Sequence, residues 1–224
     1  ALQNTVRDVT TGAADGTFRP GDSIEYTSHY EISQYADIKQ LNLTETVSNG
    51  QTIDPTVSPV LSYVAADGSN KTLDMGAITD TQVDGKNSDK IYVSGSNDYW
   101  SYTRDPQSGA TTVTFDLTKA MGDGVLPAGS SGTVVFRTKA LTTYMSDLSA
   151  DNPPIITEKD SINTSATITG TLTSVAGSDP KLNGETSAIS DSGDAGLTVP
   201  QGVPTIEIVA VNGKTPIFTT DGTN

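Results

Sequence analysis

Residues 23–32 read Ser-Ile-Glu-Tyr-Thr-Ser-His-Tyr-Glu-Ile, and their character alternates with a period of two. The isoleucines and tyrosines fall on one phase, together with Ser28, while Glu25, Thr27, His29 and Glu31 fall on the other. Successive side chains of a strand point to opposite faces, so this pattern predicts a β-strand with one buried and one solvated face. The tetrapeptide at 19–22, Arg-Pro-Gly-Asp, supplies turn residues that lead into the strand.

The same alternation recurs along the chain, separated by turns rich in Gly, Asp, Asn and Pro. Helical periodicity is limited to a single turn expected at 116–121. The stretch 177–196 is rich in Ser, Asp, Gly and Asn and is expected to be a long loop or linker, with a short edge strand as the alternative. Many strands without intervening helices predict an all-β, antiparallel, immunoglobulin-like β-sandwich of an elaborated kind. Further strands are expected at 41–47, 60–64, 91–93, 99–102, 113–117, 133–138, 162–168 and 206–211.

The sequence divides into residues 1–202, the predicted sandwich, and residues 203–224, a terminal strand or hairpin. Ile206, Ile208 and Val211 give the second part its strand character, and Asn212-Gly213 is a strong hairpin sequence. This part faintly repeats the pattern of residues 2–6. It is expected to open a following repeat, or to act as a donor strand that pairs with a neighbouring module.

Composition excludes several classes of function. The formal net charge is −14, from 27 acidic and 13 basic residues, which disfavours nucleic acid and anionic lipid as partners. Cysteine is absent, so disulfides, thiolate catalysis and cysteine-ligated metals are excluded. The longest aliphatic run, 208–211, is far shorter than the roughly 20 residues of a membrane-spanning helix, so no membrane insertion is expected.

Four segments, in this order, resemble the DUF11-like repeats of prokaryotic surface proteins: 18–27, 41–46, 126–130 and 162–168. The resemblance implies an immunoglobulin-like sandwich strung in tandem along an extracellular, cell-surface protein. Related fimbrial modules join a lysine of the first strand to an asparagine of the last strand through an isopeptide bond, assisted by a buried acid.

In this sequence the acid position falls on Glu45, which is in phase with Leu41 and Leu43 and is therefore expected to point inward. The acceptor position falls on Asn163 and the lysine position on Asn4. An asparagine amide is a weak nucleophile, so the usual bond is not expected between these positions. The three residues are therefore expected to be the remnant of a cross-link, with a displaced lysine as the open alternative. The segment 163–166 is also one residue longer than the corresponding segment of the family. The extra residue places Asn163 out of phase with Ile168, unless a β-bulge restores the register.

Catalytic chemistry finds little support in the sequence, and the protein is not expected to be an enzyme. The single histidine, His29, lies on the predicted polar face of its strand, which leaves no basis for a triad or a histidine metal site. The single tryptophan, Trp100, is interpreted as a core anchor rather than a sugar platform.

Calcium is the one cofactor for which candidate ligands exist, because hard cations prefer six to eight oxygens and acidic loops offer them. Ordinary turns have the same composition, and none of the loops fits an EF-hand. The candidates are Asp80, Asp84 and Asp89, then Asp147, Asp151 and Asn152, then Asp191 and Asp194.

Three asparagines, Asn42, Asn70 and Asn163, begin glycosylation sequons, and Asn70 is the candidate because it lies in a predicted exposed turn.

The leading functional hypothesis is a structural or adhesive module of a surface protein, as a stalk, adhesin or surface-layer element. The alternatives are a filament subunit assembled by donor-strand exchange and a ligand-binding adhesin domain. The expected partners are neighbouring repeats, identical subunits or a surface ligand of a host.

Overall fold

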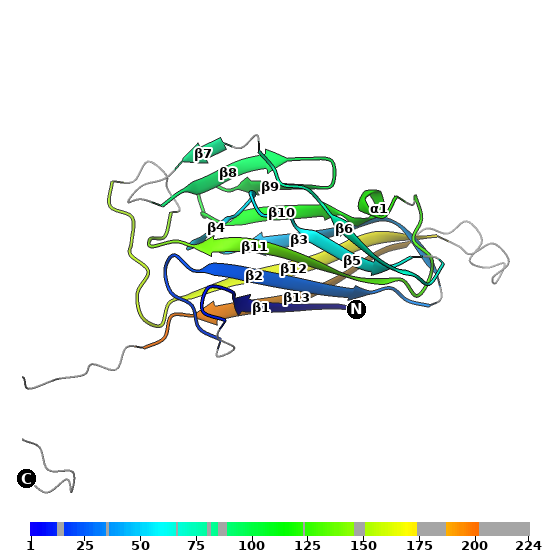
Figure 1. Cartoon of the computed structure of the whole chain (residues 1–224), viewed down its shortest axis with the longest axis horizontal. Coiled ribbons are helices and arrows are strands. Elements are labelled where there is room, and N and C mark those ends of the chain that lie inside the picture. Colours follow the sequence, from blue (N-terminus) through cyan, green and yellow to red (C-terminus); the bar gives the residue numbers. More distant parts are fainter. Residues whose placement is uncertain are drawn as a thin grey trace, which may run out of the picture.

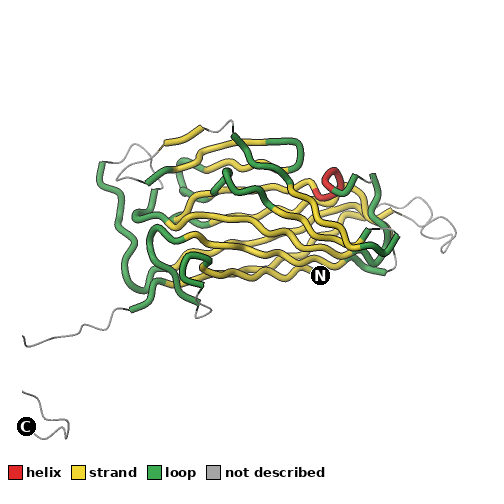
Figure 2. Tube along the Cα trace, in the orientation of Figure 1, coloured by secondary structure: helices red, strands yellow, loops and turns green. Residues whose placement is uncertain are grey.

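The structure is a computed structural model of the chain, and it describes residues 1–12, 16–34, 36–65, 67–79, 82–84, 89–122, 124–145, 151–173 and 187–201. These residues form two antiparallel β-sheets packed face to face as a sandwich (Figures 1 and 2). The first sheet, sheet A, has six strands: β1 (Leu2–Asp8), β2 (Ser23–Glu31), β11 (Ser131–Ala140), β5 (Val60–Val64) and β6 (Asn70–Asp74) in spatial order, with β4 (Gln51–Ile53) also paired to β11.

The second sheet, sheet B, has seven strands. Its spatial order is β13 (Ser187–Thr198), β12 (Ser161–Thr173), β3 (Asp37–Val47), β10 (Thr111–Asp116), β9 (Trp100–Arg104), β8 (Ile91–Ser96) and β7 (Gln82–Asp84). A single helical turn, α1 (Leu117–Ala120), follows β10, and Asp116 caps it by accepting a hydrogen bond from the backbone N–H of Lys119. The all-β antiparallel sandwich expected from the alternation is thus confirmed, as is the helical turn.

The core lies between the inner faces of the two sheets, where an aromatic chain joins one sheet to the other. Tyr26 and Phe136 of sheet A stack with their ring centroids 5.4 Å apart, and Phe136 lies 5.6 Å from Phe115 of sheet B. Phe115 in turn stacks on Trp100 at 6.0 Å. Trp100 is buried, and its indole N–H donates to the carbonyl of Gly76, so its interpretation as a core anchor is confirmed.

The segment 177–196 was expected to be a long loop or linker, with a short edge strand as the alternative. The loop is wrong for residues 187–196, which belong to an edge strand of sheet B as in the alternative, although the strand is long. Residues 177–186 lie outside the described residues. Residues 187–198 form β13, which pairs with β12 along its whole length. Ser, Asp and Gly have low intrinsic strand preference, but twelve consecutive pairings with β12 override it. Two inward side chains, Leu197 and the partly buried Ile189, join the core from this strand.

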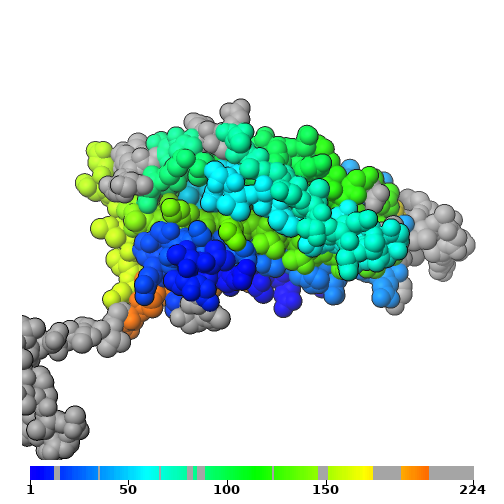
Figure 3. Space-filling view, viewed as in Figure 1, coloured from blue at the N-terminus to red at the C-terminus, as the bar shows by residue number. Residues whose placement is uncertain are grey.

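The first and last described strands, β1 and β13, lie side by side and run in the same direction (Figure 1). The backbone N–H of Leu2 donates to Asp191, and a Cβ on Gly193 would lie 3.4 Å from the backbone nitrogen of Asn4. At the other end, Thr198 bridges Thr17, beyond the end of β1. The space-filling view shows the blue N-terminal residues on the face formed by sheet A, with the orange end of β13 emerging at one end of the molecule (Figure 3). Leu2 and Thr198 therefore lie toward opposite ends of the sandwich.

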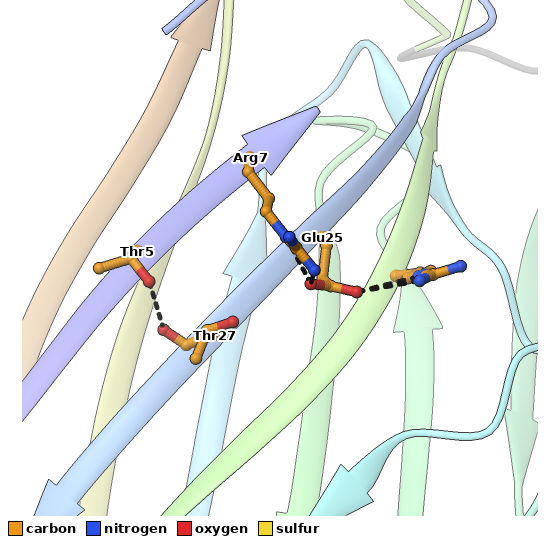
Figure 4. Close-up of polar contacts among 5 residues, drawn as sticks. Thr5, Arg7, Glu25 and Thr27 are labelled. Atoms are coloured by element: carbon orange, nitrogen blue, oxygen red, sulfur yellow. Dashed lines mark hydrogen bonds and ion pairs between the residues drawn. The ribbon is translucent and has the colours of Figure 1, made fainter. Parts of the chain in front are cut away.

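A charged ladder crosses sheet A on its outer side (Figure 4). Glu25 of β2 accepts hydrogen bonds from Arg7 of β1, at 2.7 Å from Nε, and from Arg137 of β11, at 3.1 Å from Nη2. The carboxylate side chain is 8% exposed, whereas the arginines are 66% and 39% exposed. The two arginines cover the carboxylate and tie three adjacent strands together.

We expect Glu25→Gln to lower the free energy of unfolding by about 1 kcal/mol, because the charge-assisted bonds weaken but the arginines stay solvated. The difference from wild type should shrink as NaCl is raised, since exposed guanidinium groups are screened. Urea denaturation at low and high salt measures both effects, and Glu31→Gln on the same strand is the control. A salt-independent difference would contradict this account of the ladder.

Candidate functional site: a buried acid between the sheets

Glu45 occupies the middle of β3, the third strand of sheet B, and its side chain points into the sandwich. The alternation of Leu41, Leu43, Glu45 and Val47 places all four on the buried face, and the residue is 0% exposed. A carboxyl group at this position needs polar partners, because an unpartnered polar group in an apolar interior costs several kcal/mol. The partners come from three other strands.

Three polar side chains contact the carboxyl group. Thr164 of β12 lies 2.7 Å from Oε2 through its hydroxyl, and the amide nitrogen of Asn4 on β1 lies 3.4 Å from the same oxygen. Ser28 of β2 contacts Oε1 through its hydroxyl, and this hydroxyl also lies 3.2 Å from Oδ1 of Asn4. The carboxyl group therefore joins two strands of sheet A to two strands of sheet B.

The count of protons indicates that the carboxyl group is neutral. Ser28 has one hydroxyl hydrogen but faces two acceptors, Glu45 Oε1 and Asn4 Oδ1. If Glu45 is protonated, it donates to Ser28, Ser28 donates to Asn4, and the amide of Asn4 donates back to Oε2. Each contact then has one hydrogen, and the three residues close a ring.

Electrostatics favours the same protonation state. Burial raises the pKa of Glu45 above its ordinary value, and the hydrogen bonds from Ser28, Thr164 and Asn4 oppose this only in part. Burial is likewise the main cause that raises the pKa of the neighbouring Tyr26 above its ordinary value. Within the described chain, the polar contacts of Glu45 are Asn4, Ser28 and Thr164, and none of them is a lysine.

We expect Glu45→Gln to change how stability depends on pH. The folded-state pKa of Glu45 is raised, so the folded protein holds the proton more tightly than the unfolded chain, whose ordinary value is 4.5. The stability from this group is fully present below 4.5 and is lost as pH rises through the folded-state value. The stability of wild type relative to Glu45→Gln should therefore fall as pH increases from about 4.5, as measured by Tm across a pH series. A constant difference, or one that grows with pH, would contradict a raised pKa.

Of the three expected remnant residues, the structure brings Asn4 and Glu45 together but not Asn163. Asn163 is exposed, and Thr164 points inward in its place. The reason is the phase of β12, in which Ile162, Thr164, Ala166 and Ile168 all face the core. Register places Ala166 opposite Glu45, so Thr164 reaches the acid diagonally. Ser28 and Thr164 were not singled out from the sequence, although both lie on inward phases and Ser and Thr are suitable donors.

A second buried polar cluster lies at the corner where the chain passes from β3 in sheet B to β4 in sheet A. Asn49 Oδ1 accepts from the N–H of Gly50 at 2.7 Å, the N–H of Met145 at 2.9 Å and Nη2 of Arg104 at 3.2 Å. Arg104 is 2% exposed, and burial lowers its pKa to about 10. Sequence reasoning missed this cluster, because an Asn-Gly pair reads as an ordinary turn.

The candidate calcium ligands do not meet in the described residues. Asp80 and Asp147 lie outside the described residues. Asp89 Oδ2 accepts from the N–H and hydroxyl of Thr142, and Asp191 accepts from Leu2 at the β1–β13 contact. Asp84, Asp151, Asn152 and Asp194 are exposed. Among the residues that the structure describes, no three acidic or histidine side chains gather closely enough to hold a metal ion.

Other predicted positions are found as follows. His29 is 43% exposed on β2 and contacts the hydroxyl of Thr133, in agreement with its predicted polar face. Asn70 is exposed at the start of β6, so its side chain is accessible to a glycan. Ile206, Ile208 and Val211, the donor-strand candidates, lie outside the described residues. No helix in the described part of the chain has the length and apolar character that a membrane crossing requires.

An open cavity of about 790 Å³ lies over the outer side of sheet B next to α1. Gln40, Asn42, Asp116, Lys119 and Thr171 are among its lining residues. Gln40 has a left-handed backbone, with φ of 56°, and its side-chain oxygen lies 3.4 Å from the hydroxyl of Thr171. Two of the polar side chains that line the cavity, Gln40 and Thr171, therefore contact each other.

No protein-family model matches the chain, and no curated protein matches it. The resemblance to DUF11-like repeats therefore stays a prediction. Solved structures of surface proteins are similar at low identity. The C-terminal domain of the AgI/II polypeptide BspA from Streptococcus agalactiae matches with a TM-score of 0.42 at 9% identity, over 86% of this chain and 49% of that one.

Two further matches are of the same kind. The major pilin subunit BcpA of Bacillus cereus has a TM-score of 0.40 at 13% identity, over 89% of this chain and 40% of that one. The collagen-binding subdomain ACE19 of Enterococcus faecalis surface protein ACE has a TM-score of 0.36 at 8% identity, over 87% and 94%. The chain spans about half the length of BspA's domain and less of the pilin subunit.

Proposed function

We propose that the chain is a structural module of an extracellular surface protein, a spacer that transmits tension from one end of its sandwich to the other. The observation that carries this proposal is the parallel, side-by-side arrangement of β1 and β13, with Leu2 and Thr198 toward opposite ends of the sandwich. Copies joined through these ends would lie in line, as in a stalk. Neighbouring repeats are then the partners.

The arrangement of strands favours resistance to force. When tension is applied along two adjacent strands that run in the same direction, the contacts between them are sheared together rather than broken one at a time. Strand β1 is held by the β2 ladder from Leu2 to Asp8, by Asp191 of β13, and by Asn4 in the Glu45 ring. The buried acid thus fastens β1 to β3, β12 and β2 in the middle of the sandwich.

Surface charge is consistent with a spacer. A net charge of −14 keeps copies soluble and mutually repelled, which disfavours collapse of a string of modules onto itself. Adhesive display remains part of the proposal, since a stalk presents whatever module it ends in.

The test is single-molecule pulling in two directions. The chain has no cysteine, so introduced cysteines are unique attachment points. Ala1→Cys with Thr198→Cys applies shear along β1 and β13, whereas Ala1→Cys with Glu31→Cys pulls apart neighbours at one end, where the nitrogen of Ala1 lies 2.7 Å from the carbonyl oxygen of Glu31.

We expect a higher unfolding force in the first geometry, because unfolding under force follows the barrier along the pulled direction. Equal forces, or a lower force along the strands, would reject the mechanical proposal. Both double variants should first show the wild-type Tm, which separates an effect of direction from one of stability.

A further inference from the structure

The corner between β3 and β4 contains the dipeptide Asn49-Gly50, packed between the two sheets. Gly50 has φ of 91°, and a Cβ there would lie 3.1 Å from Tyr144 Cε1 and 3.2 Å from Ile156 Cδ1. Only glycine fits this position without strain. Gly50 is buried, and its backbone N–H donates to Oδ1 of the preceding Asn49 at 2.7 Å, which places the nitrogen next to the carboxamide whose carbon, Cγ, bears this oxygen.

The side-chain carbonyl of Asn49 is polarised by an unusual set of donors. Besides Gly50, it accepts from the N–H of Met145 at 2.9 Å and from the guanidinium of Arg104 at 3.2 Å. Donors of this kind stabilise negative charge that develops on a carbonyl oxygen when a nucleophile adds to its carbon. The corner therefore has the elements of a site at which Asn49 is attacked.

No carboxylate of the described residues pairs with Arg104. It is 2% exposed, and within the described residues its acceptors are the carbonyl of Gln51 at 3.0 Å, the carbonyl of Met145 at 2.9 Å and Asn49 Oδ1. Its Nε has no partner among these residues. A buried cation held only by neutral oxygens is costly, and a carboxylate beside it would reduce the cost.

We propose that Asn49 is a self-processing site, at which the folded protein converts the asparagine to an aspartate that pairs with Arg104. This inference concerns a residue distinct from the Glu45 ring and does not depend on the mechanical function.

The steps balance as an amide hydrolysis through a cyclic imide. The nitrogen of Gly50 loses its proton to solvent base and bonds to Cγ of Asn49, while the carbonyl electrons move onto Oδ1, next to Arg104 and Met145. The carbonyl re-forms, and Nδ2 takes a proton from water and leaves as ammonia. Water then adds to Cγ and breaks the new C–N bond, which restores the Gly50 N–H and leaves a carboxylate on residue 49. No oxidant or reductant is consumed.

The fold favours aspartate over the β-linked isomer. Ring opening at the main-chain carbonyl would add one carbon to the backbone at a corner where Ser48 N–H donates to Asn163 and Gly50 packs on two side chains. Ring opening at Cγ leaves the backbone unchanged and gives a carboxylate whose Oδ1 keeps its place 3.2 Å from Nη2 of Arg104.

The experiment is peptide mapping of the full chain after incubation at pH 8 in ¹⁸O-water, folded and in urea. Conversion adds about 1 Da in ordinary water and about 3 Da when the entering oxygen is ¹⁸O. Cleavage after Lys39 and Lys71 isolates residues 40–71, in which Asn49-Gly50 is the only Asn-Gly pair. We expect a folded-to-unfolded rate ratio of one or more at Asn49, with aspartate as the main product. A slower reaction in the folded chain, or a β-linked main product, would overturn the proposal.

A variant tests the product independently of the rate. Asn49→Asp should fold and raise Tm by about 2–4 °C, the shift that a modest gain in the free energy of unfolding gives in a domain of this size. The gain should vanish in the background of Arg104→Gln, which removes the cation. A lower Tm for Asn49→Asp would show that the corner does not accept a carboxylate and would also overturn the proposal, whether or not Arg104→Gln folds.

Discussion

Replacing Glu45 by alanine is expected to lower the free energy of unfolding by about 3–5 kcal/mol, because it removes a fully buried group and leaves three others without their partner. Ser28, Thr164 and Asn4 all direct polar atoms at the carboxyl group, which is 0% exposed. The loss includes the small cavity left by the missing atoms. Urea denaturation followed by the fluorescence of Trp100, the single tryptophan, measures it.

Two variants separate the burial of Glu45 from the simple loss of a carboxyl group. Glu31→Ala removes the same group from the exposed end of β2 and should change stability by less than about 0.5 kcal/mol. Glu45→Gln retains one oxygen and gains an N–H₂ that can donate to Ser28, so it should lose less than about 1.5 kcal/mol at neutral pH. If Glu45→Gln were as damaging as Glu45→Ala, the ring with a neutral acid would be wrong.

Replacing Asn49 by alanine is expected to lower the free energy of unfolding by about 2–4 kcal/mol. The change removes the acceptor of two backbone N–H groups and one of the three acceptors of the buried Arg104 guanidinium, and the loss at the charged group is the costliest of these. The effect should appear as a shift in the urea midpoint with an unchanged m-value, since the surface exposed on unfolding is the same.

Asn152→Ala, at an exposed position of a connecting segment, is the matched control and should leave stability within about 0.5 kcal/mol of wild type. Asn49→Asp keeps the oxygen that Arg104 and Met145 use, so its behaviour should differ from that of Asn49→Ala. Equal losses for the alanine and aspartate variants would show that the amide nitrogen, rather than the oxygen, is what the corner requires.

The sequence alone determined the fold class and most of the strands. Each strand of a sandwich buries one face, so apolar and polar residues alternate along it with a period of two, and this alternation is visible in the sequence. The inward position of Glu45 followed directly from its phase with Leu41 and Leu43. The same argument placed His29 on the outside and anticipated that Asn163 would be out of phase with Ile168. Phase is a local property of a strand, so it can be read without knowing which strands are neighbours.

The tertiary structure decided which strands are neighbours and which side chains of distant segments meet, and no single strand contains this information. β13 is polar and rich in glycine, and it becomes a strand only because β12 offers a complementary edge. Likewise the partners of Glu45 lie 41, 17 and 119 residues away along the chain. Asn49 and Arg104 meet because the chain changes sheets at a corner. Period and composition describe single segments, whereas register, sheet order and the crossing between sheets depend on the packing of the whole core.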